Sequence, residues 1–117
     1  MKMIVLGINH NSASVEVRER VAFAPEQVGE ALVDVCAVAS LSEAIILSTC
    51  NRTELYAIAT DEVEAAVKAQ QLLTWVANYH HLSAEDLQGA AYHHHDEAAL
   101  QHVMQVASGL CGLLFNS

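Results

Sequence analysis

Short apolar runs alternate with longer amphipathic stretches along this chain of 117 residues. The apolar, β-branched run at residues 2–9 predicts a first strand. Two further runs, at residues 43–50 and 53–60, are separated by a few polar residues and predict a hairpin, and residues 90–94 are a candidate fourth strand.

Amphipathic stretches separate these strands. Pro25 begins residues 25–39 and predicts a helix there. An N–H in the first turn of a helix has no helical partner, so the N–H that proline lacks is not needed at this position. Asp61 predicts the N-cap of a helix over 62–79, and Asp96 that of a last helix over 97–109. The 3–4 spacing of apolar positions predicts inner faces made by Val28, Ala31, Leu32, Val35 and Val38, by Val63, Ala66, Val67, Gln70, Leu73, Val76 and Ala77, and by Ala99, Leu100, Val103, Val106 and Ala107.

Two shorter segments complete the order. Residues 14–22 fit a short helix or an extended connector, and residues 82–87 predict a helical turn capped by Ser83. The resulting β-α-β-β-α-β-α order predicts an α+β fold, a ferredoxin-like split βαβ sandwich with helices on one face of its sheet. The C-terminal helix is expected near an edge or an end of the sheet. This arrangement does not require the hairpin tip and the end of the first strand to be close.

Composition indicates one compact domain. A hydrophobic fraction of 53% and a charged fraction of 16% argue against disorder. A net charge of −9 with only five basic residues argues against a free-standing nucleic-acid binder, because phosphate contacts need clustered Lys and Arg. The three cysteines form no C-x-x-C pair, so neither a zinc ribbon nor a disulfide framework is indicated. Without a signal peptide or a membrane-spanning apolar run, a cytoplasmic protein with no membrane contact is expected.

The polar turn of the hairpin carries the strongest candidate chemistry. Cys50 lies two residues before Arg52, and a nearby cation favours the thiolate, which is the nucleophile. Thr49 and Asn51 are possible hydrogen-bond donors, and a guanidinium can hold a carboxylate with two hydrogen bonds. The alternative is a buried thiol in a polar turn, with Arg52 and Glu54 forming a surface ion pair that contributes little.

Histidines are the second group of candidates. His102 is expected to be partly buried on the last helix, either as a structural, hydrogen-bonded imidazole, which the spacing alone favours, or as a general base. His10 follows the first strand, where functional loops are common. The run His93–His95 makes a poor metal site because consecutive strand residues point to opposite faces, so no metal is predicted. No G-x-G-x-x-G motif is present, so the chain shows no dinucleotide site of its own.

Three motifs and a fourth run occur in a characteristic order: Gly7–Ala13, Arg18–Arg20, Ser48–Tyr56 and His102–Leu110. Together they resemble the N-terminal catalytic domain of glutamyl-tRNA reductase. The resemblance covers residues 3–110, so residues 1–110 are expected to be this domain. Residues 111–117 are expected to be a divergent tail, from a truncation or an artificial chain end.

The resemblance implies an NADP-dependent oxidoreductase of tetrapyrrole (porphyrin and heme) biosynthesis. The family reduces glutamyl-tRNA(Glu) to glutamate-1-semialdehyde. By this likeness Cys50 attacks the activated α-carbonyl, releases tRNA and holds a thioester, which hydride from NADPH then cleaves. His102 matches the family's histidine implicated in catalysis, and this likeness overrides the structural role that spacing alone favours.

Other site residues are also carried over by the likeness. Thr49, Asn51 and Arg52 match substrate-contacting positions, and Arg52 is the expected partner of the substrate's side-chain carboxylate. Glu54 matches a position sensitive for activity and is expected to support Arg52 by orienting it. Ser48 and His10 are expected to be supporting residues.

The family also implies a homodimer and a partner enzyme, glutamate-1-semialdehyde aminomutase. Its NADPH-binding domain, spinal helix and dimerisation domain are absent from this sequence, and Gly112 stands where the family has a substrate-contacting serine. The chain alone is therefore expected to be inactive in reduction and to stop at the thioester or lose it to water. The competing hypothesis is a non-catalytic interaction or dimerisation module, with the apolar run Leu113–Phe115 as contact surface.

Overall fold

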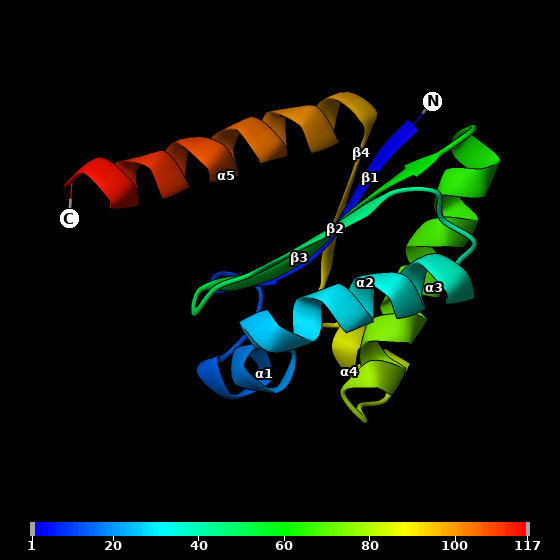
Figure 1. The fold of residues 1–117 in the computed structure, drawn as a ribbon, viewed down its shortest axis with the longest axis horizontal. Coiled ribbons are helices and arrows are strands. Elements are labelled where there is room, and N and C mark those ends of the chain that lie inside the picture. Colours follow the sequence, from blue (N-terminus) through cyan, green and yellow to red (C-terminus); the bar gives the residue numbers. More distant parts are fainter. Residues whose placement is uncertain (1, 117) are drawn as a thin grey trace.

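A four-stranded antiparallel sheet forms the centre of the molecule (Figure 1). The computed structural model describes the backbone of residues 2–116 and the side chains of residues 2–107. The strands lie in the order β2-β3-β1-β4, with every neighbouring pair antiparallel. This is the strand order of the split βαβ sandwich, so the predicted fold class is confirmed. The strands are β1 (Lys2–Asn9), β2 (Ala44–Ser48), β3 (Arg52–Ala59) and β4 (Tyr92–His95).

The helices follow the predicted order. They are α1 (Val15–Arg20), α2 (Pro25–Val38), α3 (Glu62–Tyr79), α4 (Ala84–Gln88) and α5 (Asp96–Asn116). Residues 14–22, for which the sequence allowed either a short helix or an extended connector, contain the short helix α1. Two predicted caps are confirmed, since Asp61 Oδ1 accepts from the Glu64 N–H at 2.8 Å and Ser83 Oγ from the Asp86 N–H at 3.1 Å.

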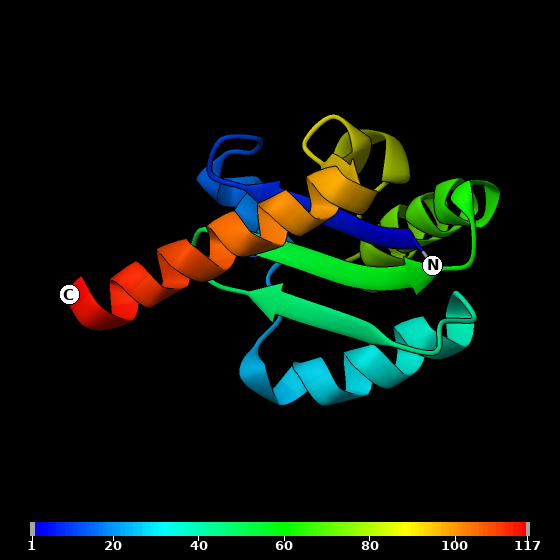
Figure 2. The same cartoon turned by 90° about the horizontal axis from the view of Figure 1, so that it is seen from above.

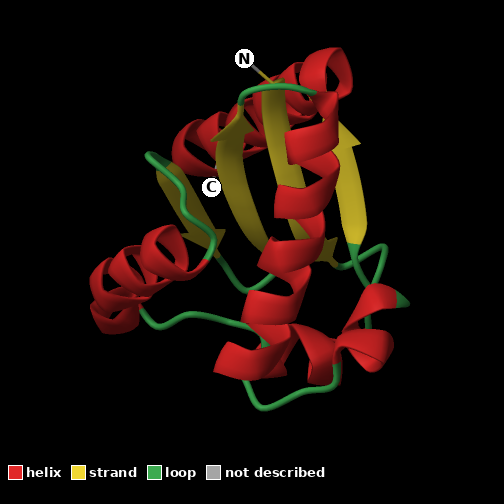
Figure 3. Cartoon of the chain, turned by 90° about the vertical axis from the view of Figure 1, so that its right-hand side faces the viewer, coloured by secondary structure: helices red, strands yellow, loops and turns green. Residues whose placement is uncertain are grey.

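Helices cover both faces of the sheet (Figures 1 and 3). Helices α2 and α3 lie on one face, and α5 runs obliquely across the other (Figure 2). The helices α2 and α3 of the split βαβ unit share one face as expected, but the expected place of the last helix, near an edge or an end of the sheet, is wrong, because α5 crosses the other face. The chain turns back over the sheet at Asp96, which has a φ of 53°. The Asp96 carboxylate lies 2.9 Å from Lys2 Nζ, which ties this turn to the start of β1.

The main core lies between the sheet and the α2–α3 layer. Within it the predicted inner faces of the helices are only partly correct. Val38 is 60% exposed, whereas Ala31 and Val35 are buried as expected. The first half of α3 is apolar on several sides, so periodicity alone selected the wrong face there. Ala65 and Ala69 are buried in place of Val63 and Val67, while Leu73, Val76 and Ala77 are buried as predicted; on α5, Ala99 and Val106 are buried but Leu100 is 53% exposed.

The hairpin tip and the end of β1 are close together. Asn9 is the register partner of Arg52, because β1 and β3 are adjacent antiparallel strands. The sequence did not require this proximity, and the sheet topology decides it. None of the described helices is both long and apolar enough to span a membrane.

Candidate active site

One row of residues across the sheet forms the floor of the site. The register places Leu47 beside Glu54, Glu54 beside Gly7, and Gly7 beside Tyr92. Side chains of such partners project from the same face of a sheet, here the face under α5. Gly7 leaves room for the Tyr92 ring, since a Cβ on Gly7 would lie 2.5 Å from Tyr92 Cζ and Oη. The tyrosine can therefore lie across β1 and reach Glu54.

Glu54 is the centre of the hydrogen-bond network. Its side chain is fully buried, and it accepts hydrogen bonds from the hydroxyls of Tyr56 and Tyr92 and from His102 Nε2. Arg52 Nη1 lies 3.6 Å from Glu54 Oε2. The alternative of a surface ion pair between Arg52 and Glu54 is therefore wrong, because the carboxylate has no exposure and has three closer donors.

The network keeps Glu54 ionised. Burial by itself opposes the charged form and raises the pKa of the carboxyl, but the hydrogen bonds from Tyr56, Tyr92 and His102 outweigh it, so the pKa of Glu54 lies below its ordinary value. The pKa values of both tyrosines are raised, mainly by burial and then by the bond to Glu54. An ionised carboxylate only accepts hydrogen bonds, so His102 carries its proton on Nε2.

Two histidines from different elements stack in this site. His102 comes from α5 with 13% of its side chain exposed, which confirms the expected partial burial. Its ring lies 4.5 Å from that of His94 on β4, at an interplanar angle of 29°. Burial, and then the neighbouring His102, lower the pKa of His94. The sequence prediction missed His94 and Tyr92, although their spacing of two on a predicted strand places them on one face.

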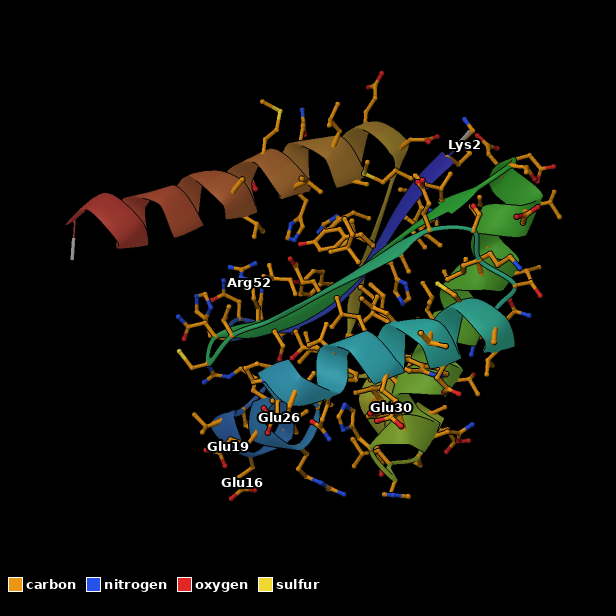
Figure 4. The ribbon with its side chains drawn as sticks, viewed as in Figure 1. Lys2, Glu16, Glu19, Glu26, Glu30 and Arg52 are labelled. Atoms are coloured by element: carbon orange, nitrogen blue, oxygen red, sulfur yellow. The ribbon has the colours of Figure 1, made fainter. Side chains whose placement is uncertain are left out.

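A cavity of about 440 Å³ opens between the hairpin, the end of β1 and α5. It brings together four residues selected from the sequence, Thr49, Asn51, Arg52 and His102. Figure 4 shows Arg52 on the α5 side of the sheet, near the hairpin. The other lining residues are Asn9, Asn11, Tyr92, His94, Gln105 and Val106.

Cys50 lies at the exposed tip of the hairpin, between Thr49 and Asn51 of the cavity wall. The alternative of a buried thiol is wrong. The Thr49 N–H donates to the Arg52 carbonyl at 2.8 Å, and Thr49 Oγ1 accepts from the N–H groups of Asn51 and Arg52 at 3.2 Å. These bonds define the turn, and the Thr49 hydroxyl can still donate its own proton.

Ser48 and His10 do not line the cavity. Ser48 Oγ accepts from the Phe23 N–H at 2.9 Å and lies 3.2 Å from Thr53 Oγ1, which ties the hairpin to the segment before α2. His10 is exposed on the turn after β1, where its neighbours Asn9 and Asn11 contribute to the cavity instead.

The site offers no fit for a dinucleotide and no metal centre among the described side chains. No group of three or more His, Cys, Asp or Glu side chains could hold a metal ion within the described part. A dinucleotide site of the usual kind needs a Gly-rich turn from a strand into a helix of a parallel sheet. Here the sheet is antiparallel, and β1 leads through a polar turn into the six-residue α1.

Comparison with known proteins identifies close relatives. The model of the family "Glutamyl-tRNAGlu reductase, N-terminal domain" matches residues 6–115. Glutamyl-tRNA reductase of Pseudomonas syringae pv. syringae (strain B728a) is 54% identical over 114 residues, which is 97% of this chain and 26% of that protein. The enzyme of the same name from Stutzerimonas stutzeri (strain A1501) has the same identity and coverage.

A solved structure shares the fold. Glutamyl-tRNA reductase from Methanopyrus kandleri aligns with a TM-score of 0.67 and 28% identity, over 92% of this chain and 22% of that one. The chain therefore spans about a quarter of the length of the relatives that it matches.

Proposed function

Because the chain belongs to the family of glutamyl-tRNA reductase N-terminal domains, we propose that it is the acyl-accepting part of an NADP-dependent glutamyl-tRNA reductase. Such an enzyme would act in tetrapyrrole biosynthesis in the cytoplasm, with glutamyl-tRNA(Glu) as substrate. One observation carries the proposal: the cavity has Arg52 and His102 in its wall, directly beside the turn that presents Cys50.

Arg52 would hold the side-chain carboxylate of the glutamyl group. Its guanidinium lines the cavity and stays 3.6 Å from Glu54, whose oxygens already accept closer hydrogen bonds. Its donor fork is therefore available for a second carboxylate. Thr49 and Asn51 would donate to the carbonyl oxygen of the reacting ester, where negative charge develops.

Cys50 would be the nucleophile. Its sulfur loses the thiol proton and forms a bond to the α-carbonyl carbon. The ester C–O bond then breaks, and the departing ribose oxygen takes up a proton. We assign to His102 the transfer of the thiol proton to this oxygen through Nδ1, since Nε2 donates to the ionised Glu54, which orients the imidazole.

The proposed chemistry stops at the thioester in this chain. NADPH would supply the hydride in the complete enzyme, but the described residues offer it no site, so the acyl group can only remain on Cys50 or be lost to water. We propose the family's homodimer and its aminomutase partner for the complete protein only. The proposed domain limit at residue 110 and the substitution at Gly112 lie outside the described side chains.

Acyl transfer tests the proposal directly. The chain is incubated with glutamyl-tRNA(Glu), quenched in acid and mapped by peptide mass spectrometry. We expect the glutamyl group on Cys50 and on neither Cys36 nor Cys111. Arg52→Gln should slow this acylation about tenfold or more, because a charge-assisted hydrogen bond is lost. The Cys50→Ala chain is the control, and glutamyl transfer that survives in it would overturn the proposal.

An interaction module is the second candidate. An apolar hollow of about 270 Å³ lies beside the edge strand β2, lined by Met3, Ile45, Leu47, Tyr56, Val103, Val106 and Ala107. Ile45 is 63% exposed there. Sedimentation at several protein concentrations distinguishes the two: a monomer that becomes acylated favours the first proposal, and a dimer broken by Ile45→Glu without any acylation favours the second.

A further inference from the structure

Arg18 of helix α1 reaches the hairpin that carries the thiol. Its Nη1 donates to the backbone carbonyl of Cys50 at 3.3 Å, across 32 positions of sequence. The Arg18 Nε is buried and has no hydrogen-bond partner among the described residues. Of the cysteines whose side chains are described, Cys50 is the exposed one.

We propose that Arg18 is a positioning residue for Cys50. Its guanidinium holds the turn by the Cys50 carbonyl and places a permanent positive charge at the tip that carries the thiol. This inference rests on the proposed function of Cys50 as a nucleophile, and it adds a group from an element outside the cavity.

The internal bonds of the turn leave its position open. Thr49 closes the turn through the backbone of Asn51 and Arg52, so these contacts fix its shape. They do not fix where the tip lies relative to the body of the domain. The pairing of Arg52 with Asn9 of β1 and the bond of Ser48 to the Phe23 N–H anchor the base of the hairpin, and the bond of Arg18 to the Cys50 carbonyl anchors its tip.

The energetics of Arg18 favour a role at the tip. A buried donor without a partner costs free energy, so burial of the Arg18 Nε does not by itself stabilise the fold. A guanidinium stays charged at every accessible pH and has further donors beyond the one that holds the carbonyl. A fixed cation near a reactive side chain attracts anionic reactants.

Arg20 is a matched control on the same helix. It carries the same charge two positions later, is exposed, and lies beside Leu82, Asp86 and Leu87 rather than beside the hairpin. Both arginines have the acidic Glu19 as a neighbour in sequence. A change caused only by net charge or by a loosened α1 would therefore follow from either substitution.

Alkylation of Cys50 by two reagents tests the charge. The rates with neutral iodoacetamide and anionic iodoacetate are measured by peptide mapping in the full chain and in Arg18→Gln, Arg18→Lys and Arg20→Gln. We expect Arg18→Gln to lower the iodoacetate-to-iodoacetamide ratio roughly two- to fivefold, the effect of one partly screened charge. Arg18→Lys should keep most of the ratio, and Arg20→Gln should leave it unchanged.

Hydrogen exchange tests the positioning. Lysine keeps the charge but has no planar fork, so amide exchange at residues 49–52 should become faster in Arg18→Lys and not in Arg20→Gln. This measurement also serves if Arg18→Gln does not fold. An unchanged reagent ratio in Arg18→Gln, or unchanged exchange in Arg18→Lys, overturns the proposal. Reactive Cys50 with an indifferent Arg18 refutes this inference alone, whereas Cys50 that accepts no glutamyl group refutes the proposed function.

Discussion

Gly7 shapes the site through the side chain that it lacks. The Tyr92 ring crosses β1 at this position, and a Cβ would lie 2.5 Å from the ring and its hydroxyl. The backbone at Gly7 is ordinary extended strand, so the requirement is space and not conformational freedom. A glycine in a strand often marks such a close approach.

We predict that Gly7→Ala destabilises the chain. The added methyl would displace Tyr92 from Glu54, at a cost of about 1–3 kcal/mol in the free energy of unfolding, as for other overpacked sites. Urea unfolding measures it. Gly29→Ala is the control, because nothing lies within 4 Å of its Cβ position in α2, and it should stabilise the helix by about 0.5–1 kcal/mol. Equal effects at the two glycines would contradict the packing argument.

Glu54 gives a second prediction at the residue scale. In Glu54→Gln the amide NH₂ would meet donors that now bond to a carboxylate oxygen, so one of them loses its partner. We expect a loss of about 1–3 kcal/mol of stability and a larger loss of Cys50 acylation, because His102 and Arg52 lose their common anchor. Glu97→Gln, at an exposed position of α5, should change neither. Full acylation in Glu54→Gln would argue against the orienting role.

At the scale of elements, α5 completes the site by crossing the sheet. It brings His102 over Glu54 and buries Ala99 and Val106 against the face that α2 and α3 leave open (Figure 2). On the other face, α3 supplies much of the core, and Lys68 from this helix donates to the Ala39 carbonyl at the end of α2. The sheet is thus held from both sides, and the site lies under one helix only.

We predict that the N-cap of α3 matters more for stability than that of α1. Asp61→Ala removes a 2.8 Å bond to a backbone N–H at the start of the helix that buries most, and should cost about 1 kcal/mol. Ser14→Ala removes a longer bond of 3.4 Å from α1, which has no buried residue, and should cost less. Thermal unfolding compares the two variants, and a larger loss for Ser14→Ala would be inconsistent with this ranking.

At the scale of the whole molecule, charge is distributed unevenly. The net charge is −9, and Figure 4 shows Glu16, Glu19, Glu26 and Glu30 on the side of α1 and α2, away from α5. Arg52 faces the opposite side of the sheet. A polyanionic substrate would therefore meet less repulsion from the side of α5 and the hairpin.

We predict that stability falls on acidification in two stages. The pKa values of His80, His93 and His94 are lowered, chiefly by burial, so the unfolded chain binds protons more readily. The contribution of these histidines to the free energy of unfolding is complete above the ordinary histidine pKa of 6.5 and is lost as the pH falls below that value. The pKa of Glu54 is also lowered, so the contribution of Glu54 to stability is lost as the pH falls below the ordinary value of 4.5.

Urea unfolding from pH 8 down to about pH 3 measures both stages, because the second stage lies below the ordinary pKa of Glu54. His94→Gln should flatten the first stage and Glu54→Gln the second, because each removes one of the groups that titrate. A free energy of unfolding that rises from pH 7 to pH 5.5 would contradict the assignment of the histidines.

The sequence by itself determined the elements and their chemistry. Helix caps at Asp61 and Ser83 and the polar turn around Cys50 depend on residues within a few positions of one another, so local pattern and composition are sufficient to predict them. The order of these elements then restricts the fold, because a split βαβ order allows few sheet topologies.

The tertiary structure alone decided which residues meet. Glu54 bonds to Tyr92 and His102 across 38 and 48 positions of sequence, and no local pattern encodes those pairs. They depend on strand register, where a shift by one residue would turn Glu54 to the other face, and on the close approach at Gly7. The sequence also did not determine the position of α5. An amphipathic pattern specifies which face of a helix is buried, but not which surface of the domain packs against that face.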